Sequence, residues 1–121
     1  MITIEDFRKL ELKIGRVLEV QPHPNADKLY LIKVDLGRRV VTGADGNPAE
    51  ERDVRELVAG IRAYYAAEAL IGKQIVVLAN LEPAVIRGIT SQGMLLATRD
   101  SQNNLSIVTT ERTVEEGSPV S

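Results

Sequence analysis

The sequence of 121 residues contains no cysteine and a single histidine, His23. The absence of thiols excludes disulfide bonds, thiolate catalysis and cysteine-based zinc sites. A lone imidazole excludes a metal site built from several histidines. His23 lies between two prolines, so we expect it to shape its loop, and we expect neither a metal ion nor another cofactor.

Aromatic side chains are scarce, since they make up 3% of the chain and tryptophan is absent. No apolar run reaches the length of a membrane-spanning helix, and the charged N-terminal segment is unlike a signal peptide. We therefore expect a cytoplasmic protein. A formal net charge of −2 argues against a strongly basic nucleic-acid binder, although the 15 lysines and arginines can still gather on one face.

The composition is that of a folded protein, with 44% hydrophobic and 26% charged residues. A chain of this length fits one hydrophobic core, because two cores would leave each half near the lower limit of independent stability. We therefore expect a single domain over residues 1–121.

The N-terminal part combines a short helix with a strand. Thr3 and Asp6 resemble the capping pair of a helix, which can cover an edge or an end of a barrel. From Leu10 to Val20 the apolar residues fall mostly on even positions, the period of a half-buried strand. Gly15 interrupts this alternation, and a glycine inside a strand often marks a bulge or a bend. We therefore predict a first strand that turns a barrel corner.

The middle of the chain permits two interpretations. "LYLIKVDLG" predicts a second strand that Arg38–Thr42 can continue, and "GADGNP" is a dense turn signal for a long hairpin. Beyond this turn, Asn47 as a cap, Pro48 at the first helical position and apolar residues at helical spacing favour a helix. Val54–Ile61 also fits a third strand, and local signals leave the choice open.

The remaining segments complete the pattern of an all-β protein. "YYAAEALIG" predicts a compact helix that ends at Gly72, and "QIVVLAN" is a β-branched run of strand length. "GMLLAT" and "LSIVTT" supply the last extended pieces. The order of three strands, a helix and two strands is that of an OB-fold, a five-stranded Greek-key barrel. We therefore predict this fold, with a helix between strands 3 and 4 and a short N-terminal helix.

Four stretches in sequence order carry a resemblance to a known family: "HPNADKLYLIKVDLG", "VAGIRAYYAAEALIGK", "VVLANLEPAVIRGITSQGMLLA" and "TVEEGSPVS". They closely resemble the tRNA-binding domain of methionyl-tRNA synthetase C-termini and of small free-standing tRNA-binding proteins. The resemblance implies an OB-fold in which Val54–Gly60 is the third strand, against the helical interpretation. It also implies a hairpin insertion around Arg39–Arg55, because in the family the second strand passes quickly to the third.

The resemblance further implies an RNA-facing role for Lys28, Asn80, Arg87, Ser91, Gln92 and Met94. In this role Lys28 and Arg87 would neutralise phosphates, so that binding weakens with salt. Ser91 and Gln92 can donate and accept hydrogen bonds, and Met94 offers an adaptable apolar contact.

Most of these residues also have a structural interpretation. Met94 begins an apolar run and fits the core equally well, Asn80 can cap a strand end, and Lys28 can pair with Asp27. Arg87, in a predicted loop, is the hardest to explain by structure alone. The RNA-facing interpretation therefore rests most on Arg87.

The function implied by the resemblance is non-catalytic binding of folded tRNA, by a free protein or by an appendix of methionyl-tRNA synthetase. Because aromatic residues are few, extended base stacking is hard to build, so backbone contacts and shape should carry the affinity. No glycine-rich nucleotide loop or activated nucleophile is present, and Asp45 and Glu50 specify no reaction by their spacing.

The resemblance also bears on assembly and on an alternative function. Bacterial-type members commonly form homodimers through their terminal segments, and this chain contains both "ITIEDF" and "TVEEGSPVS". We therefore expect a homodimer. A secretion-chaperone family is similar over much of the chain but lacks the "SQGM" loop. Peptide binding on the same barrel is therefore the alternative to tRNA binding.

Overall fold

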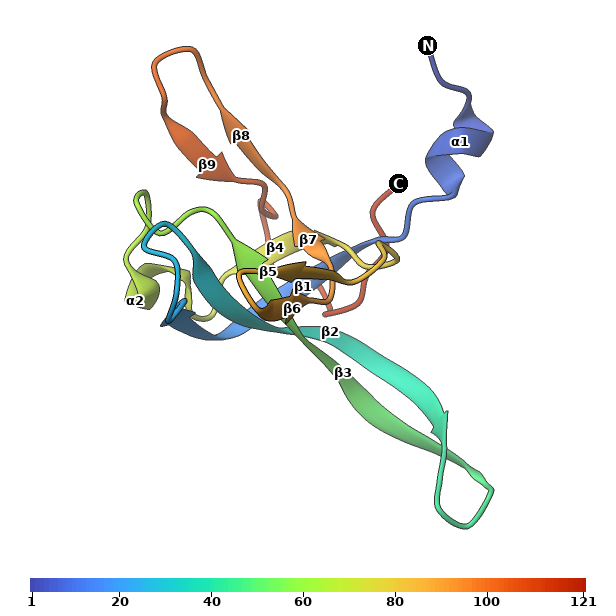
Figure 1. Ribbon diagram of the computed structural model, residues 1–121. Coiled ribbons are helices and arrows are strands. Elements are labelled where there is room, and N and C mark those ends of the chain that lie inside the picture. Colours follow the sequence, from blue (N-terminus) through green and yellow to red (C-terminus); the bar gives the residue numbers. More distant parts are fainter.

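A curled antiparallel sheet of five strands, in the order β3-β2-β1-β4-β7, forms the body of the computed structural model, which describes residues 1–121 (Figure 1). Its strands are β1 (Leu12–Pro22), β2 (Tyr30–Thr42), β3 (Pro48–Ala59), β4 (Gln74–Leu78) and β7 (Met94–Leu95). Helix α2 (Ala67–Leu70) lies between β3 and β4, and α1 (Ile4–Arg8) precedes β1. Two further hairpins join β5 (Ala84–Ile86) to β6 (Ile89–Ser91) and β8 (Ala97–Arg99) to β9 (Leu105–Ile107). The prediction of an all-β OB-fold with these two helices is confirmed.

The first strand bends the sheet because it pairs with a different neighbour in each half. Residues 12–16 of β1 pair with β4, and residues 16–22 pair with β2, with a register shift between Val17 and Glu19. At Gly15 an added Cβ would lie 2.8 Å from Leu36 Cδ2, so the strands approach each other where only glycine fits. The first strand changes its partner as a strand at a barrel corner does, but its register shift lies between Val17 and Glu19 and not at Gly15, which pairs regularly with Ile75.

The core is one cluster of inward-facing residues from all main strands. Alternate positions of β2 supply Ile32, Val34 and Leu36, and β3 supplies Leu57. Leu70 of α2 is 1% exposed and covers one end of the cluster. Burial of each such side chain contributes roughly 1.5–3 kcal/mol, which makes this cluster the main source of stability.

The third strand that the resemblance implies at Val54–Gly60 is present as part of β3, and the helical interpretation of the segment after Asn47 is wrong. β3 pairs with β2 from Ala59 opposite Tyr30 to Pro48 opposite Thr42. β2 pairs with this segment along nearly its whole length, so the ladder of hydrogen bonds outweighs the local cap signals. The outer part of this two-stranded hairpin projects far from the barrel (Figure 1).

The N-terminal helix has the predicted cap but does not pack on the barrel. The Thr3 hydroxyl accepts a hydrogen bond from the Asp6 amide, and the Asp6 carboxylate accepts one from the Thr3 amide. No residue of α1 is buried, and the helix points away from the barrel (Figure 1). The helix therefore does not use the possibility of covering an edge or an end of its own barrel. Neither α1 nor α2 has the length and apolar character needed to cross a membrane.

Candidate nucleic-acid interface

The loop between β1 and β2 and the β5–β6 hairpin together form a rim at the side of the barrel. Lys28 and Arg87 line one pocket of about 390 Å³, together with Ala26, Asp27 and Leu29. Lys28 and Arg87 are both exposed, and neither forms an ion pair. Lys28 is thus not the partner of Asp27. The loops that follow the first strand and precede the last are the ones through which OB-folds bind oligonucleotides.

Arg87 occupies the tip of a tight hairpin. Ile86 pairs with Ile89, so only Arg87 and Gly88 form the turn. Their φ angles are 53° and 88°, as in the type I′ turns that fit the twist of two-residue hairpins. A positive φ is common at glycine and uncommon at arginine. The hairpin therefore holds the Arg87 guanidinium exposed at its tip at some conformational cost.

His23 joins the two loops of this rim. Its side chain is buried, with 3% exposed, and its Nδ1 accepts a hydrogen bond of 3.0 Å from the Asn25 amide. The proton of the neutral ring therefore lies on Nε2, which donates to the Ile86 carbonyl at 3.1 Å. His23 shapes its loop as expected, but its link to the hairpin was missed. No local sequence signal points to a partner 63 residues away.

Ser91 and Gln92 attach their loop to the free edge of β3. The Ser91 hydroxyl accepts from the Val58 amide at 3.0 Å and donates to the Gly93 carbonyl at 2.9 Å. Gln92 Oε1 accepts from the Glu56 amide at 3.0 Å, and the Gln92 amide donates to the Glu56 carbonyl at 2.9 Å. Ser91 is 4% exposed, whereas Gln92 is exposed. Both side chains replace strand-to-strand hydrogen bonds where the barrel closes.

Arg55 reinforces this closure and was not singled out from the sequence. Its guanidinium donates to the carbonyls of Ala79 and Gln92, the latter at 3.3 Å. Two further bonds, of 3.1 and 3.0 Å, bind it to the buried carboxylate of Asp53. The stretch "EERDVRE" contains several charges, and nothing local marks Arg55 as the one that turns inward.

The two remaining residues of the predicted site lie elsewhere. Asn80 accepts a hydrogen bond from the Glu11 amide at 2.9 Å and donates to the Lys9 carbonyl at 2.7 Å. It thereby ties the segment after α1 to the end of β4. Met94 is 46% exposed and lines an apolar groove rather than the core. Of the six residues, the structure brings only Lys28 and Arg87 into one pocket, and their contact with RNA stays a prediction.

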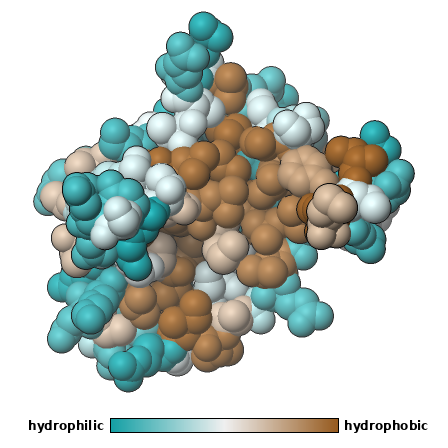
Figure 2. Space-filling view, turned by 90° about the horizontal axis from the view of Figure 1, so that it is seen from above, coloured by the Kyte–Doolittle hydropathy of each residue, from teal (hydrophilic) through white to brown (hydrophobic).

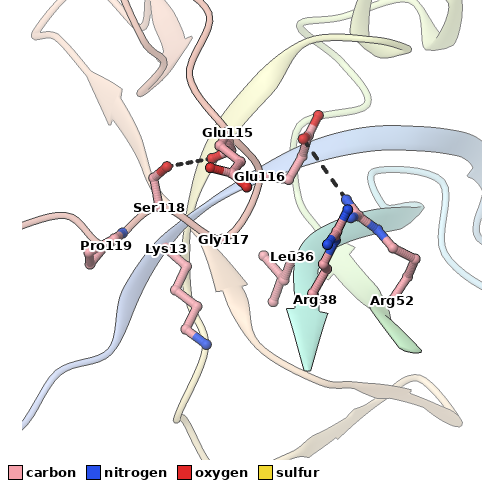
Figure 3. A pocket seen from close by; sticks show the side chains of 9 residues that line it. All are labelled: Lys13, Leu36, Arg38, Arg52, Glu115, Glu116, Gly117, Ser118 and Pro119. Carbon is pink, nitrogen blue, oxygen red and sulfur yellow. Dashed lines mark hydrogen bonds and ion pairs between the residues drawn. The ribbon is translucent and has the colours of Figure 1, made fainter. Parts of the chain in front are cut away.

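A second charged pocket, of about 340 Å³, lies beside the C-terminal segment, but most of its charges are paired (Figure 3). Arg52 binds Asp35 at 2.7 Å and lies 3.9 Å from Glu116, and Glu116 also binds Arg16 at 2.6 Å. Burial raises the pKa of Asp35, but the hydrogen bond and the charge of Arg52 outweigh it, so the pKa lies below its ordinary value. The hydrogen bond from Arg16 lowers the pKa of Glu116. This pocket suits a polyanion less than the rim does.

Comparison with protein families identifies the relatives of this fold. A family model described as "Putative tRNA binding domain" matches residues 12–119. The chain belongs to this family. Methionine–tRNA ligase of Pyrococcus horikoshii is 44% identical over 98% of the chain, which spans only 14% of the length of that relative. The resemblance inferred from the sequence is confirmed.

Two solved structures extend the comparison of this tRNA-binding domain. A MetRS-related protein from Pyrococcus horikoshii superposes with a TM-score of 0.81 at 24% identity, covering 99% of this chain and 97% of the other. The chaperone CsaA from Bacillus anthracis superposes with a TM-score of 0.80, also at 24% identity, covering 100% and 99%. These likenesses show a shared fold.

Proposed function

We propose that this tRNA-binding domain binds folded tRNA through the rim that carries Lys28 and Arg87, and that it catalyses no reaction. It acts as a free protein or as part of a methionyl-tRNA synthetase. The observation that carries the proposal is that one pocket between two OB-fold loops contains two exposed cations, Lys28 and Arg87. Neither of them forms an ion pair within the protein. Family membership names the ligand class, and the unpaired cations supply the chemistry that phosphates need.

We infer that recognition depends on RNA shape more than on sequence. Phe7 and three tyrosines are the only aromatic residues, and Tyr30 is buried in the core. Contacts to phosphates position an RNA without reading its bases, whereas reading single-stranded RNA requires several stacking surfaces. The protein therefore favours folded tRNA over a single strand of equal length.

We assign the six residues different parts in this function. Lys28 and Arg87 contact phosphates, while Ser91 and Gln92 hold the loop between the rim and the groove in place. Met94 contacts RNA from the groove. Asn80 acts indirectly, since both ends of its amide bind the N-terminal segment.

The experiment that tests the function is a titration of labelled tRNA followed by fluorescence anisotropy at several salt concentrations. Arg87→Ala should weaken binding and reduce the slope of log K against log salt by about 0.7–0.9, the value for one lost phosphate contact. Arg112→Ala is the matched control, because Arg112 is also exposed and outside any ion pair. Equal effects of both variants would contradict a site at the rim, and no binding of tRNA at low salt would end the proposal.

Peptide binding remains the second candidate because of the apolar groove beside Met94. An exposed apolar groove is the feature expected of a chaperone for unfolded chains. A labelled unfolded polypeptide added in the same assay separates the two functions. Tight binding of the polypeptide with no binding of tRNA would favour the chaperone.

A further inference from the structure

An apolar groove of about 350 Å³ runs between two segments at one end of the barrel. One wall consists of residues 58–61 and the other of residues 94–97, and all are apolar except Gly60. Seen from above, the molecule carries a broad hydrophobic area in the middle of its face (Figure 2). Exposed apolar surface on this scale marks a place where a ligand or partner binds.

The segments that form the two walls of the groove are also joined beyond each of its ends. At the first end the Val58 amide donates to the hydroxyl of Ser91, the last residue of the Arg87 hairpin, so the groove begins beside that hairpin. At the second end the Tyr64 amide donates to the Ile61 carbonyl at 2.9 Å. Arg99, two residues beyond the other wall, places its guanidinium 5.4 Å from the centre of the Tyr64 ring. The segments that continue the two walls therefore approach each other at Arg99 and Tyr64, just beyond the residues that line the groove.

Arg99 is available to a ligand. It is exposed and forms no ion pair, and it sits on a ring whose hydroxyl donates to Asn103 at 3.1 Å. A guanidinium near an aromatic ring and outside any ion pair keeps its N–H groups free for phosphate. Arg62, which directly follows the other wall, is likewise in no ion pair.

An apolar slot with an unpaired cation just beyond its lining residues matches one kind of ligand well. An unpaired nucleobase presents two apolar faces, and the phosphate joined to it through the ribose presents a negative charge nearby. A base inside a duplex has both faces stacked and cannot enter the slot. An apolar peptide would fill the slot without using the arginine.

We propose that the groove between Val58–Ile61 and Met94–Ala97 binds an unpaired nucleobase of tRNA, with Arg99 on the adjoining phosphate. This rests on the proposed function and adds the RNA element that is recognised. The rim and the groove lie at the two ends of residues 88–93, which contain β6. A single RNA then places a paired stem at Lys28 and Arg87 and an unpaired nucleotide beside Met94.

The two methionines of the chain make a direct test possible. Met94 lines the groove, and Met1 is fully exposed at the N-terminus, so selective ¹³C-methyl labelling gives one reporter signal and one internal control. The probes are a single-stranded RNA tetranucleotide and intact tRNA. We expect both to shift the Met94 methyl signal through the ring current of the bound base and to leave Met1 in place.

Two variants and one control decide whether the shift reports on the groove. Arg99→Ala should weaken tetranucleotide binding by about fivefold or more, and Ala97→Glu should abolish the Met94 shift by placing a carboxylate in the groove. Arg112→Ala should change neither. Unchanged thermal unfolding of each variant shows that the fold is intact.

The outcomes separate this inference from the proposed function. Binding of tRNA that leaves the Met94 signal unmoved, or that Arg99→Ala does not alter, overturns the groove proposal and leaves the rim proposal standing. A shift caused by an apolar peptide but not by RNA assigns the groove to peptides and overturns it as well. A shift by the tetranucleotide without any binding of tRNA overturns both the function and the groove proposal for tRNA, and leaves only a site for single-stranded RNA.

Discussion

The imidazole of His23 uses both of its ring nitrogens to join two loops far apart in the sequence. One nitrogen orders its own loop through Asn25, and the other binds the hairpin whose tip is Arg87. The distance between the two cations of the rim therefore depends on a residue that does not line their pocket. This makes His23 a positioning residue for the proposed site.

We predict that His23→Ala weakens tRNA binding and reduces the contribution of Arg87 to the affinity for tRNA. The substitution leaves the Asn25 amide and the Ile86 carbonyl without their partner, which costs about 1–3 kcal/mol for each group that stays buried. A double-mutant cycle of dissociation constants for tRNA measures the coupling. The double variant should lose less affinity than the sum of the two single losses. Strictly additive losses would show that His23 does not position Arg87.

A second prediction at the residue scale concerns Ser91. Ser91→Ala removes the partner of the Val58 amide at the closure of the barrel and should lower the free energy of unfolding by about 1–3 kcal/mol. Urea denaturation measures this loss, and Thr90→Ala at the exposed neighbouring position is the control. In the folded variant the affinity for tRNA should change little. A large loss of affinity at unchanged stability would instead mean that Ser91 contacts the RNA directly.

The largest separate element is the outer part of the β2–β3 hairpin. It leaves the barrel at a register shift between Asp35 and Arg38, where the chain of β2 passes the C-terminal segment at Gly37. Beyond this point the strands are joined by exposed ion pairs, such as Arg39 to Glu51 at 2.6 Å. Exposed pairs of this kind contribute little to stability. We propose that this part is an insertion into a domain that otherwise spans the whole chain.

Shortening the hairpin tests this proposal. Replacing residues 40–50 by Asn-Gly connects Arg39 to Glu51, which already face each other, through a two-residue turn. We expect the urea midpoint and the affinity for tRNA to stay close to those of the intact protein, because the core and the rim are untouched. Denaturation and anisotropy measurements provide the comparison. A marked drop in affinity at normal stability would show that the hairpin takes part in binding.

At the scale of the whole molecule, the two chain ends lie together on one side of the barrel. The Val120 amide donates to the Leu12 carbonyl at 2.9 Å, just after the segment that carries α1. Ile2 and Ile4 are 72% and 56% exposed, and a five-residue helix with no buried side chain gains no stability from packing on its own barrel. We propose that this surface joins two copies of the chain, which would place two rims on one particle.

We predict a homodimer that Ile4→Glu dissociates. The charge placed at the interface would have to be buried without a partner, whereas Glu5→Gln on the same exposed helix is a control that leaves the apolar side chains in place. Sedimentation at tens of micromolar measures the mass. A dimer should also bind tRNA more tightly than the Ile4→Glu monomer, since two sites act together. A monomeric wild-type protein would remove this part of the proposal.

The sequence by itself determined the elements whose signals are local. Strand period, turn residues and the Thr3–Asp6 cap predicted most of β1, β2 and β4, the turn before β3 and the start of α1. Such signals reflect the backbone preferences of neighbouring residues and the alternation of apolar and polar side chains. Both are properties of a short stretch of chain and stay the same in the folded protein. The family resemblance supplied Lys28 and Arg87, which the fold then brings into one pocket.

The tertiary structure alone decided everything that depends on a distant partner. Local signals left the segment after Asn47 open between helix and strand, and its pairing with β2 extends the third strand back to Pro48. Ser91 bonds the open edge of β3, and Arg55 bonds the carbonyls of Ala79 and Gln92. The hydrogen bond from His23 to Ile86 and the approach of Arg99 to Tyr64 likewise join residues that are far apart in the sequence. Each of these contacts needs two partners that only folding brings together. No short stretch of sequence contains both partners, so local signals cannot predict the contact.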